Sequence, residues 1–376
     1  MFCRFLVAIF VLLHTAAALP PANILRRSPS PPTHYYALGD SYASGIAAGN
    51  YIDSKINSPD WKCSRFDHAY GKLLNGMLDG QKSRDFHFLA CSGNTCQDVQ
   101  KTQKPSTNAD LVTLTVGGND VGFSNVVEAC VYQFGGVFTS NCDSALTQTK
   151  NNIAGSLWNS LWNTIESIVT TVGKSNQNFK LFVTSYPQFW NQGTDQCDSI
   201  SFSYWPGPSG SDKMTKDKRT KMNNLSKQMN AVILSVVQNW NNPQNSHHDT
   251  RIHYVDIDSA FEGHRFCENK YKEPWWDDEP NGRPDQWIFQ LFTEKSLRSA
   301  RVGAQGDGLY YVQEMQKAQK NDPSLTPPSN YAPYLVKPGD NLSGGLPLSI
   351  SKIFHPTSNG QQAIANAIQN SFHALG

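Results

Sequence analysis

Three short polar stretches carry residue types that acyl transfer requires. They are Gly39-Asp40-Ser41, Cys91-Ser92-Gly93-Asn94 and Gly117-Gly118-Asn119-Asp120. Glycine allows positive φ angles and lets a ligand approach main-chain N–H groups closely. Acyl transfer needs a nucleophile surrounded by hydrogen-bond donors, because negative charge develops on the carbonyl oxygen in the transition state. The hydroxyl of Ser41, the N–H of Gly93 and the amide of Asn119 would together supply these groups.

A nucleophilic serine also needs a base, and His355 is the best candidate among the ten histidines. It directly precedes Pro356 and a helical stretch of small residues, so it lies on a loop at a helix entry. The other histidines in the body of the chain favour structural or solvated roles. His264, close to Cys267, could line a cleft, but a structural role is favoured there as well.

Each of these features has a simpler interpretation when taken alone. Ser41 could cap the helix that follows it, and a Gly-Gly-Asn-Asp stretch is more often a turn than a donor site. The Gly-Asp and Gly-Asn-Asp stretches also faintly resemble two-metal phosphoesterases. Such sites need an Asp-x-His near the first strand and a His after the Asn, and Asn119 is followed by Asp120 and Val121. We therefore expect neither a metal nor a cofactor.

The elements that must position these residues alternate between strand and helix. Apolar runs predict strands at 35–38, 86–90, 111–116, 181–184 and 252–257, and helical patterns span 153–172, 212–240 and the stretch after Pro356. Gly173 is the expected C-cap of the first helix. Short apolar strands separated by helices predict a parallel sheet covered on both faces, with the site at the carboxyl ends of the strands.

The N-terminus has the pattern of a secretory signal peptide over residues 1–18. A basic start, the apolar run 5–13 and the small residues 16–18 are its three parts. Residues 19–32 are rich in Pro and carry Arg26-Arg27, which predicts a disordered leader or propeptide. Residues 33–376 are then expected to form a single domain with a long insertion at about 268–354. No later stretch is apolar for long enough to span a membrane.

Charge and cysteine content narrow the class of protein further. The net charge is +1 and no cluster of basic residues is long enough to follow a phosphate backbone, so a nucleic acid partner is not expected. Seven cysteines remain after the signal peptide, and in an oxidising compartment most should pair with one left over. Sequons at Asn224 and Asn341 predict surface glycosylation. These features favour a secreted, extracellular glycoprotein, which we expect to be a monomer.

Four motifs, and the order in which they follow one another along the chain, resemble those of the SGNH hydrolase superfamily, also called GDSL esterases and lipases. They are "GDSY" with Ser41, "ACSGN" with Gly93, "TVGGND" with Asn119 and "HPTSNG" with His355, and "SYPQFW" and "FEGHRFC" resemble its secreted actinomycete and fungal branch. The resemblance implies a flavodoxin-like three-layer α/β/α sandwich with a five-stranded parallel sheet. It makes Ser41 the nucleophile and His355 the general base. The oxyanion hole would comprise the N–H groups of Ser41 and Gly93 and the side chain of Asn119.

The resemblance, together with the order of the cysteines, also favours three disulfides. These are Cys63–Cys91, Cys130–Cys142 and Cys197–Cys267, with Cys96 left unpaired. Many members of the superfamily orient the histidine with an Asp three residues before it, where this sequence has Lys352. We therefore expect a dyad in which the main-chain carbonyl of Lys352 accepts from His355 Nδ1. An acid in the insertion, such as Asp322 or Asp340, is the alternative that would complete a triad.

The function implied is that of a secreted serine carboxylic ester hydrolase, an esterase or lipase that acts through an acyl-enzyme. The substrate could be a lipid, a short-chain ester or an acetylated sugar, so a carbohydrate acetylesterase is one alternative. A catalytically idle binding or effector protein on the same fold is another. In the insertion, Trp275, Trp276 and residues 287–289 could form a substrate-facing wall or lid, or could cover a sheet edge or fill a subsidiary core.

Overall fold

A five-stranded parallel sheet forms the centre of the protein. The computed structural model describes residues 29–55, 57–132, 141–173, 176–202, 213–270, 273, 285–289 and 353–375. The strands are β1 (His34–Gly39), β2 (Asp85–Phe88), β3 (Leu111–Thr115), β4 (Lys180–Thr184) and β5 (Ile252–Val255), in the order β2-β1-β3-β4-β5. The central strands β1 and β3 are apolar runs because helices cover both of their faces. The predicted strands and their parallel arrangement are confirmed.

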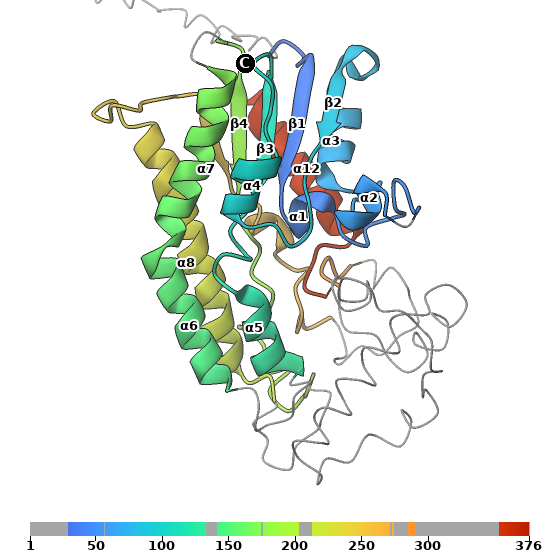
Figure 1. Ribbon diagram of the computed structural model, residues 1–376. Coiled ribbons are helices and arrows are strands. Elements are labelled where there is room, and N and C mark those ends of the chain that lie inside the picture. The colour runs from blue at the N-terminus through green and yellow to red at the C-terminus, as the bar shows by residue number, and fades with distance from the viewer. Residues whose placement is uncertain are drawn as a thin grey trace, which may run out of the picture.

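Helices cover the two faces of the sheet and complete the predicted α/β/α sandwich (Figure 1). One layer contains α4 (Cys96–Thr102), α6 (Cys142–Gly155), α7 (Leu157–Val172) and α8 (Lys216–Trp240), and the other contains α3 (Tyr70–Met77) and α12 (Ser358–His373). The short elements are α1 (Ser41–Ser44), α2 (Pro59–Lys62), α5 (Phe123–Val127), η1 (Gln81–Ser83), η2 (Glu128–Tyr132) and η3 (Ser259–Phe261). In Figure 1 the strands end near α1, at the lower edge of the sheet.

The first predicted helix differs from expectation at its amino-terminal end. The apolar pattern over 153–172 predicts one helix, whereas the structure has two, α6 and α7, which meet at Ser156. Gly155 and Ser156 both have low helix propensity, so interrupting the helix at these residues costs little free energy. Gly173, with φ 80°, is the C-cap of α7 as expected.

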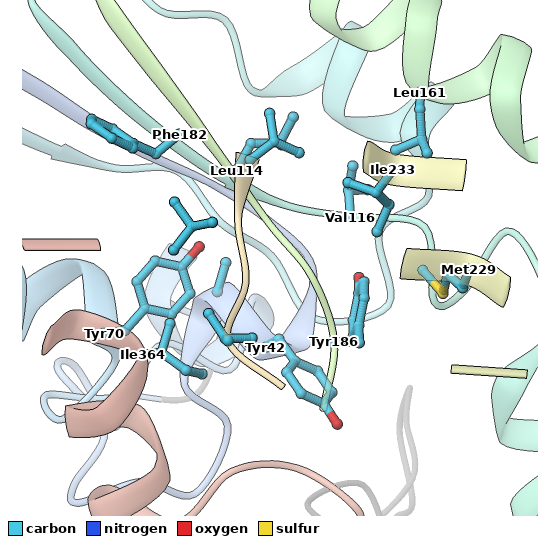
Figure 2. Packing of buried hydrophobic residues seen from close by; sticks show 14 of the residues in the cluster. Tyr42, Tyr70, Leu114, Val116, Leu161, Phe182, Tyr186, Met229, Ile233 and Ile364 are labelled. Carbon is cyan, nitrogen blue, oxygen red and sulfur yellow. The ribbon is translucent and has the colours of Figure 1, made fainter. Parts of the chain in front are cut away.

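The core lies on both sides of the sheet. Figure 2 shows Leu161 of α7 and Ile233 of α8 next to Val116, and Tyr70 of α3 next to Ile364 of α12. Several hydroxyls buried in this core are paired with one another, because an unpaired buried polar group is costly. The paired oxygens belong to Tyr35 and Thr113 (3.0 Å), Tyr70 and Thr115 (2.8 Å), and Thr115 and Thr184 (2.6 Å).

Three disulfides lie within the described ranges. They are Cys63–Cys91, Cys130–Cys142 and Cys197–Cys267, the same pairs that the resemblance implies, and Cys96 is free and buried. The first joins the end of α2 to the turn that follows β2, at the edge of the sheet where the strands end. No helix of the described chain is long and apolar enough to cross a bilayer.

Several predicted features lie outside the described residues. They are the signal peptide and most of the leader, Trp275, Trp276, Asp322, Asp340, Asn341 and Lys352. The other sequon asparagine, Asn224, lies on α8 and is exposed. Its side chain is therefore accessible from solvent.

Candidate active site

The turn after β1 presents Ser41 at the carboxyl edge of the sheet. Gly39 ends the strand with φ 132°, and a Cβ there would collide with the carbonyl oxygen of Thr115. The next residue, Asp40, donates its N–H to that same oxygen at 2.9 Å. Its side chain caps α1 by accepting from Tyr42 N, so Asp40 is the helix cap and Ser41 is the first helical residue. The hydroxyl of Ser41 is therefore available for another role.

That hydroxyl contacts His355, which comes from the other end of the chain. Ser41 Oγ lies 2.6 Å from His355 Nε2, although the two residues are 314 positions apart. On the other side of the ring, His355 Nδ1 lies 3.1 Å from the carbonyl oxygen of Ile353. A carbonyl can only accept, so Nδ1 carries the proton and the neutral ring offers the lone pair of Nε2 to the serine hydroxyl.

The structure places one main-chain carbonyl, that of Ile353, close to Nδ1 of His355. The carbonyl of Lys352, which the sequence suggested as the acceptor, lies outside the described residues, so that part of the expectation stays a prediction. The Ile353 carbonyl reaches the ring because of the backbone between Ile353 and the histidine. Phe354 adopts a left-handed conformation with φ 63°, which turns the chain so that the carbonyl two positions before His355 faces its ring.

Hydrogen bonds between the turns hold Gly93 and Asn119 beside the first turn. Gly93 has φ 83°, and the space where a Cβ would stand is open. The Asn119 side chain donates to the carbonyl of Asn94 at 2.9 Å, which joins the second turn to the third. Gln103, buried on the far side, accepts from Gly39 N (2.7 Å) and donates to Gly39 O (2.8 Å) and to Asn94 Oδ1 (2.7 Å). Gln103 therefore joins the first turn to the second, a role with no signal in the sequence.

Tyr186 makes a second connection between the turns, through the residues next to Ser41 and Asn119. It comes from the "SYPQFW" stretch, and its hydroxyl donates to Asp40 Oδ2 at 2.5 Å and accepts from Gly118 N at 3.3 Å. It thereby connects the turn of Ser41 with the turn of Asn119. Burial raises the pKa of Asp40 from its ordinary value to about 7, although the hydrogen bonds from Tyr186 and from Tyr42 N lower it.

Phe289, from the segment expected to be an insertion, holds the loop of His355. Phe289 donates its N–H to His355 O at 2.8 Å, and Phe354 donates to Phe289 O at 2.9 Å. The side chains of Ile288 and Phe289 are buried, which fits packing rather than a substrate-facing wall for these two residues. Trp287 stacks on His264 with ring centroids 3.5 Å apart.

His264 and the acidic residues near the turns have structural contacts. His264 Nδ1 lies 2.6 Å from the carbonyl of Asp285, which fits a structural role for this histidine. The carboxylate of Asp120 accepts from Cys96 N, with oxygens at 3.0 and 3.2 Å. Within the described ranges, no group of three or more His, Cys, Asp or Glu side chains could hold a metal ion.

The sequence pattern of the GDSL-like lipase/acylhydrolase family matches residues 37–363, which include all four motifs. The chain belongs to this family. As a GDSL-like lipase/acylhydrolase, it is an enzyme that hydrolyses esters, and its fold is that of the SGNH hydrolases.

Relatives of this GDSL-like hydrolase come from Streptomyces. Lipase 1 of Streptomyces coelicolor is 28% identical over 267 residues, which cover 70% of this chain and 83% of the relative. A lipase of Streptomyces rimosus is 28% identical over 245 residues, or 65% of this chain and 75% of the relative. The crystal structure of phospholipase A1 from Streptomyces albidoflavus NA297 has the same fold, with a TM-score of 0.55 and 21% identity over 90% of this chain and 99% of that one.

Proposed function

We propose that this enzyme is a secreted serine carboxylic ester hydrolase that acts through an acyl-enzyme. Ser41 Oγ attacks the ester carbonyl while His355 Nε2 takes the hydroxyl proton. The same nitrogen then protonates the leaving alcohol. Water, deprotonated by His355, attacks the acyl-enzyme in the second half of the reaction and releases the acid.

The observation that carries this proposal is the 2.6 Å contact between Ser41 Oγ and His355 Nε2. A base must lie within hydrogen-bond reach of the proton it removes, and this pair meets that condition. The carbonyl of Ile353 supports the mechanism in two ways. It holds the proton on Nδ1, so that Nε2 is the basic nitrogen, and its partial negative charge favours the imidazolium that forms during attack.

The oxyanion hole that we propose consists of the N–H groups of Ser41 and Gly93 and the side-chain amide of Asn119. The side-chain amide of Asn119 donates one of its hydrogens to the carbonyl oxygen of Asn94. This bond fixes the plane of the amide group and therefore the direction in which its second hydrogen points. The positive φ of Gly93 and the open space at its α-carbon allow close approach of a substrate to its N–H. Donors of this kind contribute on the order of 3 kcal/mol each to transition-state stabilisation.

Secretion and processing also belong to the proposal. The apolar run after the basic N-terminus supports a signal peptide over residues 1–18, and residues 19–32 would be a leader ahead of one domain that spans 33–376. Three disulfides support folding in an oxidising compartment. Glycosylation is proposed at Asn224, which is exposed, and at Asn341.

The test of the proposal is Ser41→Ala and His355→Ala, assayed on p-nitrophenyl esters from acetate to palmitate and on acetylated xylan. Each variant should lose activity on the order of a millionfold, because the two residues act as a unit. Ser83→Ala, at the other end of the sheet, is the matched control and should keep wild-type turnover. Asp322→Asn and Asp340→Asn should also keep it, since a carbonyl already faces Nδ1.

Three outcomes would contradict parts of this proposal. Turnover above a few per cent in purified, folded Ser41→Ala would exclude the serine as nucleophile. A loss of about ten-thousand-fold in Asp322→Asn or Asp340→Asn would show that an acid completes a triad. Activity confined to acetylated xylan would identify a carbohydrate acetylesterase instead.

A further inference from the structure

Tyr42, the residue next to Ser41, makes two hydrogen bonds to the segment that carries His355. Its hydroxyl donates to the carbonyl of Phe354 at 2.6 Å, and its own carbonyl accepts from Gln361 Nε2 at 3.0 Å. Phe354 directly precedes the histidine, and Gln361 lies in the first turns of α12, six positions after it. The two bonds therefore hold the chain on either side of His355.

The bond to Phe354 lies at the point where the histidine loop turns. Phe354 has φ 63°, a conformation that costs a side chain with a Cβ on the order of 1 kcal/mol and persists only where its surroundings hold it. Its carbonyl points toward the buried Tyr42 and needs a donor there. The tyrosine hydroxyl is that donor, and the turn that it holds also directs the Ile353 carbonyl to the ring of His355.

Tyr42 is itself held in place by contacts with Asp40 and Tyr186. Its N–H donates to Asp40 Oδ1 at 2.9 Å, and its ring packs edge-on against Tyr186 with centroids 4.9 Å apart. Figure 2 shows the two tyrosine rings next to each other. Tyr186 is held in turn by its bond to Asp40 Oδ2. The tyrosine is therefore a rigid spacer between the serine turn and the histidine loop.

The main-chain carbonyl of Tyr42 is held by Gln361, which is itself fixed by its neighbours. Gln361 is fully buried, and its Oε1 accepts from Tyr70 N at 2.9 Å while its Nε2 donates to Tyr42 O. Gln361 thus ties α12 to α1 and to α3. Gly360 beside it leaves no room for a Cβ, which would collide with Pro356 and with the carbonyl of Trp287. The start of α12 therefore cannot shift relative to Ser41 without breaking one of these contacts.

We propose that Tyr42 is a positioning residue that sets the distance between Ser41 Oγ and His355 Nε2 through its hydroxyl bond to Phe354. The inference rests on the proposed roles of Ser41 and His355. Tyr42 does not transfer a proton, because its hydroxyl proton is held by a carbonyl and burial raises its pKa well above the ordinary value. Its contribution is geometric, and a misplacement of the base by about 1 Å can cost on the order of a hundredfold in rate.

The test is Tyr42→Phe, which removes the hydroxyl and keeps the ring, with Tyr35→Phe as matched control. Tyr35 is also buried. It lies near the start of β1, at the end of the strand away from Ser41, and its hydroxyl is paired with that of Thr113. Both variants should lower the melting temperature by about 1 to 3 °C, as expected for one lost hydrogen bond in a domain of this size. On p-nitrophenyl acetate, Tyr42→Phe should lower kcat about ten- to a hundredfold with KM within twofold of wild type. Tyr35→Phe should leave both constants within twofold.

A second variant keeps the inference testable if Tyr42→Phe does not fold. Gln361→Met removes both the donor to the Tyr42 carbonyl and the acceptor of Tyr70 N, with little change in volume, and it should likewise lower kcat while KM stays within twofold. Labelling of the serine by a fluorophosphonate should slow in parallel with kcat in both variants, because the label also needs the aligned base.

The outcomes separate this inference from the proposed function. If Tyr42→Phe keeps kcat within twofold of wild type while Ser41→Ala is inactive, the positioning role is wrong and the proposed mechanism stands. Equal losses of kcat in Tyr42→Phe and Tyr35→Phe would also overturn it, because the effect would then be a general loss of stability. Full turnover by Ser41→Ala would instead remove the basis of the mechanism itself.

Discussion

Asp40 shows how a single residue of the "GDSY" motif affects the stability of the fold. It is 1% exposed, and its two carboxylate oxygens accept from Tyr42 N and from the Tyr186 hydroxyl. Burial raises its pKa from 3.8 to about 7 in the folded protein. The folded state therefore holds the proton more tightly than the unfolded chain. Its contribution to the free energy of unfolding is fully present below about pH 4 and is lost as the pH rises to about 7.

Asp40→Asn should remove this pH dependence. The amide does not titrate, so the stability of wild type relative to the variant should fall as the pH rises from 4 to 8, by up to on the order of 4 kcal/mol. Urea denaturation at intervals of one pH unit measures the difference. Asp79→Asn, at an exposed carboxylate, is the control and should show a much smaller trend. A constant difference between wild type and Asp40→Asn would mean that this carboxyl does not titrate in that range.

At the scale of elements, contacts from the residues at the end of α2 hold the turn that carries Gly93. The disulfide Cys63–Cys91 reaches this turn, and Ser92 donates its N–H to Cys63 O at 3.0 Å. Arg65 adds a bond from Nε to the carbonyl of Ala90 at 2.8 Å. The turn after β2 is thus held from outside the sheet, next to the proposed oxyanion donor.

Removal of this disulfide should lower both stability and activity. The double variant Cys63→Ala/Cys91→Ala should lose about 3 kcal/mol of stability, since the bridge closes a loop of moderate length. Its kcat should fall as well, because the Gly93 turn loses its covalent tether. Cys130→Ala/Cys142→Ala is the matched control, which should lose comparable stability and keep kcat. Thermal unfolding and p-nitrophenyl acetate kinetics, measured well below both melting temperatures, separate the two effects, and an equal kcat in the two double variants would contradict the tethering role.

At the scale of the whole molecule, the proposed route through a secretory pathway accounts for the disulfides and the sequons together. The full chain expressed in yeast should appear in the medium, with an N-terminus after Ala18, or after Arg27 if the leader is also removed. Digestion with an endoglycosidase should lower its mass, and Asn224→Gln should remove part of that change. A chain that lacks residues 2–18 is the control and should stay inside the cell. Retention of the full chain in the cell with Met1 still present would contradict the proposal.

Much of the fold and of the candidate site was predictable because the signals are local. Short apolar runs separated by helical patterns indicated the five parallel strands, since period and turn chemistry are properties of neighbouring residues. The carboxyl ends of parallel strands share one edge of a sheet, so that rule alone brought the turns of Ser41, Gly93 and Asn119 together. The position of His355 at a helix entry was readable for the same reason.

Only the tertiary structure decided how these groups are held. The left-handed turn at Phe354 brings the carbonyl of Ile353 to the ring of the histidine, and a positive φ at a phenylalanine has no signature in the sequence. The bond from Tyr42 to Phe354 joins residues 312 positions apart. Contacts of this kind depend on how elements pack, whereas the sequence by itself determines which residues are present at each turn and the period that forms the elements.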